Sequence, residues 1–75
     1  MLHNTVELQN ELKQWVLHRT GRRVRDLDIE LEAERIVLKG CVTSYHVKQL
    51  AQQGVRERLP DVQLENAIVV SRELN

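Results

Sequence analysis

The chain has 75 residues, so we expect one domain over residues 1–75, with its core at about 5–71. Lysine and arginine together number 11, as do aspartate and glutamate, and this balance argues against a general nucleic-acid binder, which carries a basic surplus. The single cysteine, Cys41, excludes an internal disulfide framework, and the scarcity of aromatic residues argues against a base-stacking platform.

The sequence also limits the cellular setting. No apolar run approaches the ~20 residues that cross a bilayer. The first residues lack the basic and apolar segments of a signal peptide. As written, the chain is expected to be cytoplasmic. The alternative is a periplasmic or membrane-associated domain, if the sequence is a fragment of a longer exported protein.

The first predicted element is a helix over about residues 5–20. Asn4 followed by Glu7 fits a capping box at its start. Gly21 stands where a left-handed residue closes a helix. Apolar residues recur at helical spacing and predict one buried stripe: Leu8, Leu12, Trp15 and Val16. Val6 and Leu17 fall on the opposite, outer face.

Two strands follow, over residues 26–32 and 35–42, because apolar and polar residues alternate in both. The apolar positions are odd-numbered in the first strand and even-numbered in the second, which requires a hairpin loop of even length. A two-residue loop at Ala33-Glu34 gives a definite register, and a four-residue loop would keep the same register. It pairs Leu31 with Ile36 and Ile29 with Leu38 inside, and Glu32 with Arg35 and Asp28 with Lys39 outside.

A second helix is predicted over about residues 45–59, with Thr43 or Ser44 as its N-cap. Its apolar stripe comprises small and aliphatic residues: Val47, Leu50, Ala51, Gly54 and Val55. We interpret Gly54 as allowing close approach to the sheet. Pro60 ends the helix, and a last strand covers about residues 62–71, in which Asn66 needs hydrogen-bond partners if it is buried.

The element order is therefore α-β-β-α-β. A right-handed crossover through the second helix would place the last strand parallel to the second strand. The sequence predicts an α+β fold, with two helices packed on one face of a three-stranded mixed sheet.

This order resembles the BON domain (bacterial osmotic-stress and nodulation domain) over about Leu8 to Val70. The resemblance is carried by the small-residue helix and by two spaced-aliphatic strands, Ile36-x-Leu38-x-Gly40-x-Val42 and Val62-x-Leu64-x-Asn66-x-Ile68-x-Val70. It implies a non-enzymatic, bacterial stress-response module that binds phospholipid membranes or another protein chain at the envelope. Two departures weaken the envelope role more than the fold. The hairpin turn is Ala33-Glu34 without the family's common glycine, and there is one copy with no signal sequence.

The first candidate site is a basic cluster at the end of the first helix. Guanidinium groups match phosphate oxygens because they donate two parallel hydrogen bonds. The cluster predicts contact with anionic phospholipid, beside the outer-face residues Val6 and Leu17, and comprises Lys13, Arg19, Arg22, Arg23 and Arg25. The alternative is a solvated loop whose arginines pair with Asp26 and Asp28.

The second candidate is the uncovered face of the sheet. If the second strand is central, four small or apolar residues gather there: Val37, Cys41, Ala67 and Val69. Such a patch predicts weak self-association or docking of another protein chain. The alternative is a solvated face with scattered aliphatic residues.

No catalytic or metal site emerges. His3, His18 and His46 do not form a metal-binding spacing with Cys41, and Ser44 reads as a helix cap. We therefore expect no enzyme activity, no cofactor and no metal. An alternative RNA-binding module of the KH type requires a Gly-x-x-Gly loop, and Gly21, Gly40 and Gly54 are too far apart to supply one. Nucleic acid is thus not an expected partner.

Overall fold

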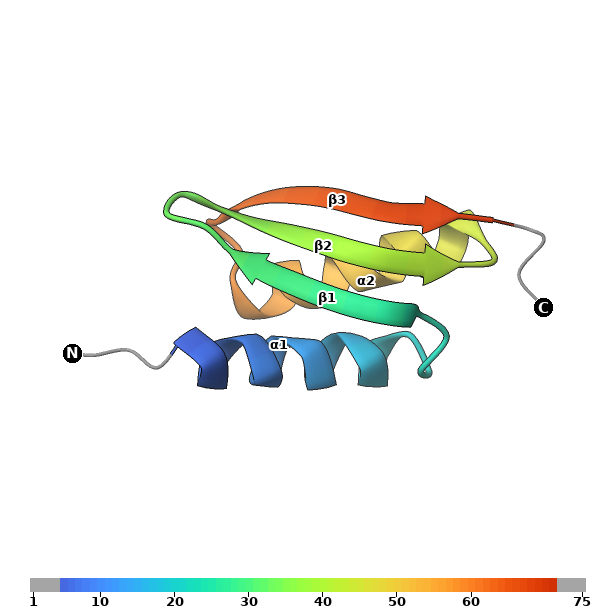
Figure 1. The fold of residues 1–75 in the computed structure, drawn as a ribbon, viewed down its shortest axis with the longest axis horizontal. Coiled ribbons are helices and arrows are strands. Elements are labelled where there is room, and N and C mark those ends of the chain that lie inside the picture. The colour runs from blue at the N-terminus through green and yellow to red at the C-terminus, as the bar shows by residue number, and fades with distance from the viewer. Residues whose placement is uncertain (1–4, 72–75) are drawn as a thin grey trace.

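The computed structural model describes residues 5–71 and contains the expected elements in the expected order (Figure 1). Their bounds are α1 Thr5–Arg19, β1 Arg25–Leu31, β2 Arg35–Val42, α2 Tyr45–Arg58 and β3 Gln63–Val70. Asn4, the proposed capping partner of Glu7, and His3 lie outside the described residues. The N-cap of α2 is Ser44, whose hydroxyl accepts a hydrogen bond from the Val47 amide.

The sheet has the order β1-β2-β3, with β1 antiparallel and β3 parallel to the central β2. Helix α1 contacts β1, α2 contacts β2 and β3, and the two helices contact each other. In Figure 1, α2 crosses behind the sheet while α1 runs along the side of β1. The α+β architecture with a mixed three-stranded sheet is confirmed.

The predicted hairpin register is also confirmed. Leu31 faces Ile36, Ile29 faces Leu38 and Asp28 faces Lys39. On the outer face, Arg35 forms the expected ion pair with Glu32, at 2.8 Å. The Lys39 ammonium instead bonds the Glu30 carboxylate, at 2.9 Å, rather than Asp28 directly opposite. Diagonal neighbours are within reach of a long side chain, so the register does not by itself decide which carboxylate is paired.

An irregularity that the alternation did not predict lies at the start of β1. The pairing shifts between Arg25, which faces Cys41, and Asp28, which faces Lys39. Such an extra residue is a β-bulge, and Asp26 within it has a positive φ of 56°. Opposite the bulge, Gly40 has a φ of 152°, and a Cβ there would lie 2.9 Å from a Val24 methyl and 3.0 Å from the Arg25 carbonyl oxygen. The bulge therefore requires glycine at position 40.

One buried cluster forms between the helices and the inner face of the sheet. Four predicted helix positions differ from expectation. Leu8 is 38% exposed, because only the end of α2 reaches the first turns of α1. Leu50 of α2 is half-buried rather than buried. Leu17, expected on the outside, packs partly against the core. The space beside Gly54 is bounded by Val16 and Arg19 of α1 rather than by the sheet.

Side-chain amides occupy backbone groups at both edges of the sheet. The Gln9 amide nitrogen donates to the Ile29 carbonyl on β1, at 2.8 Å. On β3, the Asn66 oxygen accepts from the Ile68 amide at 3.2 Å, and its nitrogen donates to the Lys48 carbonyl at 3.1 Å. The hydrogen-bond partners of Asn66 are thus a backbone carbonyl of α2 and a backbone amide of β3 itself.

Candidate functional site

The turn between α1 and β1 projects arginines from one end of the molecule. Thr20, which is fully buried, anchors it by donating its hydroxyl to the Val16 carbonyl at 2.8 Å. Gly21 and Arg22 both have positive φ, 64° and 60°, and the Arg22 amide donates to the Leu17 carbonyl at 2.7 Å. This left-handed pair closes the helix as expected at Gly21. It also turns the chain so that Arg22, Arg23 and Arg25 are all exposed.

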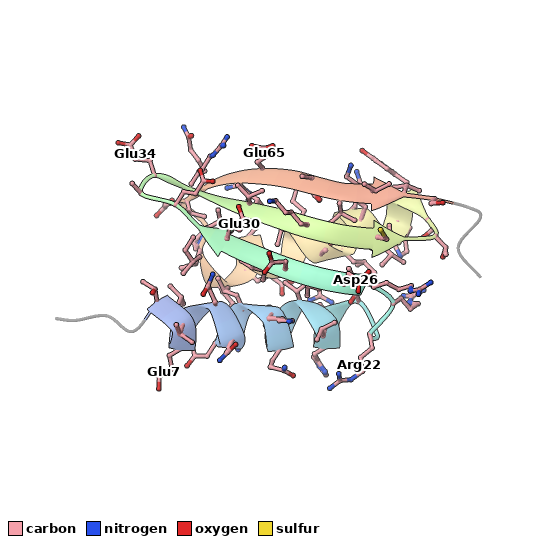
Figure 2. All side chains as sticks on the ribbon, viewed as in Figure 1. Glu7, Arg22, Asp26, Glu30, Glu34 and Glu65 are labelled. Atoms are coloured by element: carbon pink, nitrogen blue, oxygen red, sulfur yellow. The ribbon has the colours of Figure 1, made fainter. Side chains whose placement is uncertain are left out.

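We call these three residues, Arg22, Arg23 and Arg25, the basic loop. Figure 2 shows Arg22 at the end of α1, pointing away from the sheet that carries Asp26. Within residues 5–71, no ion pair joins the basic loop to Asp26 or Asp28. Of the three, only Arg23 forms a side-chain hydrogen bond within residues 5–71: its Nε donates to the Thr20 carbonyl at 2.9 Å. A carbonyl is neutral, so this bond pairs the Arg23 charge with no carboxylate. The pairing that would have neutralised the loop does not form.

The other two members of the predicted basic cluster are placed differently. Lys13 is exposed on α1, roughly 9 Å along the helix axis from Arg19. Arg19 faces α2, where its guanidinium bonds both carboxylate oxygens of Glu57, at 2.9 and 2.8 Å. Its charge is therefore already matched. Val6 is exposed but lies at the opposite end of α1, so it does not sit beside the basic loop.

Glu57 is the centre of a polar group that joins the two helices, comprising Trp15, Arg19, Glu57 and Arg58, which we call the interhelix clamp. The Trp15 indole nitrogen donates to Glu57 at 3.2 Å, and the Arg58 guanidinium lies 4.3 Å from the centre of the Trp15 ring. Sequence reasoning did not find this clamp. Trp15 and Arg19 are one helical turn apart, but their meeting with Glu57 depends on how the helices cross.

The clamp predicts a pH dependence of stability. Hydrogen bonds from Arg19 are the main reason that the pKa of Glu57 is held below its usual range. A carboxylate with a depressed pKa in the folded state stabilises the fold above its unfolded pKa, and this contribution is lost as pH falls through the folded pKa. Replacing Glu57 with glutamine should therefore cost most near pH 7; the difference should begin to shrink as pH falls below the usual glutamate pKa of about 4.3 and should vanish only below the lower folded pKa.

Urea unfolding of both proteins, followed by fluorescence of the single tryptophan, would measure this difference at each pH. Replacing Glu11 with glutamine is a matched control, because Glu11 forms no ion pair within residues 5–71. A Glu57 variant whose deficit stayed constant from pH 7 to pH 3 would show that the carboxylate charge contributes nothing.

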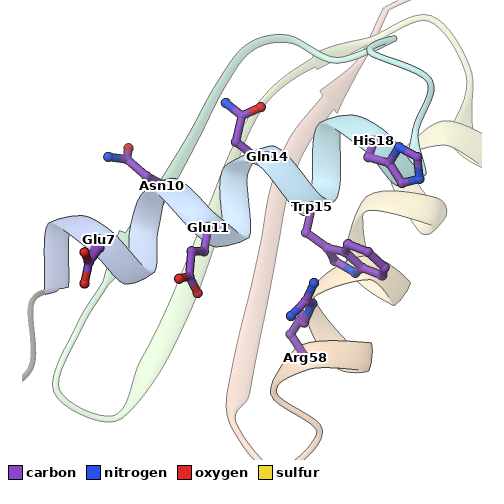
Figure 3. Close-up of a pocket in the computed structure, with 7 residues that line it drawn as sticks. All are labelled: Glu7, Asn10, Glu11, Gln14, Trp15, His18 and Arg58. Carbon is purple, nitrogen blue, oxygen red and sulfur yellow. The ribbon is translucent and has the colours of Figure 1, made fainter.

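A shallow groove of about 590 Å³ runs along α1 beside the last turn of α2 (Figure 3). Its lining mixes acidic, amide, aromatic and basic side chains: Glu7, Asn10, Glu11, Gln14, Trp15, His18 and Arg58. In Figure 3, Arg58 and the Trp15 indole lie against each other at one end of this row. Arg58 thus occupies the aromatic surface that a ligand would use, and the mixed charges select no class of ligand.

The predicted patch on the uncovered sheet face needs a correction. Val37 is only 5% exposed, because the ion pairs of its neighbours close over it: Arg35 with Glu32 and Glu65, and Lys39 with Glu30. Of the remaining patch residues, Cys41 is half-buried, while Ala67 and Val69 are exposed on β3. The exposed apolar surface is therefore displaced from the centre of the sheet to its β3 side.

Within the described part of the chain, no group of histidine, cysteine, aspartate and glutamate could hold a metal ion. His18 and His46 are exposed, as expected of surface residues. None of the helices in residues 5–71 has the length and apolar character needed to cross a membrane.

No protein-family model, curated protein or solved structure matches this chain. The resemblance to the BON domain remains a prediction that rests on the spacing of aliphatic residues and on the order of elements.

Proposed function

We propose that the chain is a non-enzymatic, BON-like module that binds anionic phospholipid surfaces through the basic loop. The observation that carries the proposal is the contrast between two sets of basic residues. Arg19, Arg35 and Lys39 are each matched by a carboxylate at 2.6 to 2.9 Å. Arg22, Arg23 and Arg25 have no carboxylate partner within residues 5–71, although the chain as a whole carries equal numbers of acidic and basic residues.

The backbone at Arg22 supports the same proposal. A left-handed φ costs a residue with a Cβ roughly 1–2 kcal/mol relative to the right-handed region, whereas glycine adopts it freely. Arg22 nevertheless holds a φ of 60° directly after a glycine. A strained position that carries an exposed charge is a reason to propose a role for that charge. Each arginine near an anionic membrane contributes about 1 kcal/mol of attraction.

The test is flotation of the full chain with phosphatidylglycerol vesicles and with phosphatidylcholine vesicles. We expect recovery on the anionic vesicles only, with a decrease at high salt as the charges are screened. Replacing Arg22 with glycine should weaken binding about fivefold. The same variant should keep or slightly increase its stability, by up to ~1 kcal/mol, because it relieves the left-handed strain.

Replacing Arg56 with glutamine is the matched control. It also removes one positive charge, but Arg56 lies near the C-terminal end of α2, where it bonds the Val62 carbonyl. Its variant should bind anionic vesicles as well as the wild type does. Equal recovery on neutral and anionic vesicles, or equal losses in the two variants, would contradict the proposal.

A further inference from the structure

The open edge of β3 presents backbone groups whose direction the structure determines. The Ser71 amide donates to the Val42 carbonyl of β2 at 2.8 Å, so the backbone groups of residue 71 point toward β2. Within the plane of a sheet, the backbone amide and carbonyl groups of successive residues point alternately toward one neighbouring strand and toward the other side. The amide and carbonyl groups of Ile68 and Val70 therefore point away from the sheet. The capture of the Ile68 amide by the Asn66 side chain agrees with this direction.

The two edges of the sheet are protected to different extents. The β1 edge has α1 along its side, the Gln9 bond to Ile29, a bulge and several acidic residues. Bulges, charges and covering elements are the usual means by which proteins prevent pairing at an edge. In Figure 1, neither helix extends beyond β3. Among the described residues, the Asn66 side chain is the one group that bonds an outward-pointing amide of β3.

The last residues of β3 are also apolar and uncharged. Residues 67–70 read Ala-Ile-Val-Val, and Val69 and Val70 are 56% and 36% exposed. The single charged residue of the strand, Glu65, is bound by Arg35 at 2.6 Å. Exposed β-branched residues on an open edge without a repelling charge are favourable for pairing with another strand.

We propose that β3 pairs antiparallel with β3 of a second copy of this chain, about a two-fold axis at Val69. In this register, Ile68 of one copy faces Val70 of the other, and these residues exchange backbone hydrogen bonds. The two Val69 residues face each other as a non-hydrogen-bonded pair, with their Cα atoms about 4.5 Å apart. The register keeps the helices of both copies on the same face and covers the most exposed valine of the strand.

Asn66 limits the strength of this contact. The Ile68 amide must leave the Asn66 oxygen before it can donate to Val70 of the second copy. With Asn66 in place, only the Val70 amides are free to donate across the interface. The dimer is therefore weak in the wild type, and removal of the Asn66 oxygen strengthens it.

Sedimentation equilibrium of the full chain tests the contact. The wild type should form dimers as its concentration rises toward millimolar. Replacing Val69 with lysine, on the solvent face, should abolish dimers by placing two like charges in contact. Replacing Asn66 with alanine should tighten the dimer roughly tenfold or more, since one amide per copy is released. Replacing Asn66 with aspartate, which still accepts from the Ile68 amide, should not tighten it.

Cross-linking tests the register. Because Cys41 faces Val69 within one chain, it is first replaced by alanine. Adding the Val69→Cys substitution should then give a disulfide-linked dimer on mild oxidation, since facing residues meet disulfide geometry. Adding Ala67→Cys in place of that change should not. A wild type that stays monomeric at millimolar concentration, or equal cross-linking at both positions, would overturn the proposal.

Discussion

Replacing Gly40 with alanine is expected to lower the free energy of unfolding by roughly 2–5 kcal/mol, which combines overpacking with backbone strain. The φ of 152° is unfavourable for any residue with a Cβ. The new methyl group would also lie 3.0 Å from the Arg25 carbonyl and 3.4 Å from the Leu27 Cα, both backbone atoms of the bulge. Neither atom can move aside without breaking the pairing of β1 with β2.

The other glycines provide graded controls in the same urea titration. Gly21 also has a positive φ, but a Cβ there would meet nothing closer than a side-chain atom at 3.6 Å, so alanine should cost only about 1 kcal/mol. At Gly54 the added methyl would make ordinary contacts at 3.6 Å with Val16 and Arg19. Alanine there should increase stability by up to ~1 kcal/mol through helix propensity. A Gly40 variant as stable as the Gly21 variant would contradict this account of the bulge.

Replacing Leu38 with alanine should cost about 2–5 kcal/mol, the range for removing a large buried side chain. Leu38 lies on the central strand, is fully buried and belongs to the core between both helices and the sheet. Stable domains generally have only about 5–15 kcal/mol in total, and a chain this short has a thin core. We therefore expect a cooperative loss of helical circular dichroism at a much lower temperature than in the wild type.

Val37 gives the matched comparison because it is the next residue on the same strand and is also buried. It faces the other side of the sheet, where charged side chains rather than the core cover it. Alanine there should cost only about 1–2 kcal/mol, close to the transfer free energy of the lost methyl groups. Equal losses at Val37 and Leu38 would show that the outer face is packed as tightly as the core.

The parts of this fold that could be predicted depend on two local signals: the odd or even numbering of apolar positions in the strands, and the residues that begin or end a helix. Odd apolar positions before the hairpin and even ones after it allow only an even-length loop, and this gave the register of Leu31 with Ile36. Ser44 and Pro60 bracket the second helix in the sequence, and its observed bounds, Tyr45–Arg58, agree. The parallel placement of β3 followed from the crossover expected through the helix between it and β2.

The features that could not be predicted depend on contacts between distant elements. Glycine at position 40 was visible, but nothing along the chain marks the bulge that it faces. Nothing along the chain marks Glu57, whose pairing depends on the packing of α1, which brings Arg19 beside it. Val37 was expected to be exposed, since alternation gives only the face of a strand, and long neighbouring side chains determine what remains uncovered.

The candidate site was predicted in part. The basic cluster was found from its composition, and the three arginines of the basic loop are exposed without carboxylate partners within residues 5–71. Removal of Arg19 from this set required knowledge of the helix crossing. For the outer-face patch, alternation along the last strand correctly placed Ala67 and Val69 on its exposed face. The direction of the backbone groups at the β3 edge could be determined only from the hydrogen bonds of the structure.

The single parallel crossover also shapes the kinetics of folding. Helix α1 and the β1–β2 hairpin join residues that are close in sequence, whereas every β2–β3 pair is separated by the whole of α2. Contacts between distant residues require closure of a long loop and form late. A transient species with β2 unpaired along one side is therefore expected before β3 docks. At high protein concentration, that open side can accept β3 from another chain, which would exchange strands between molecules.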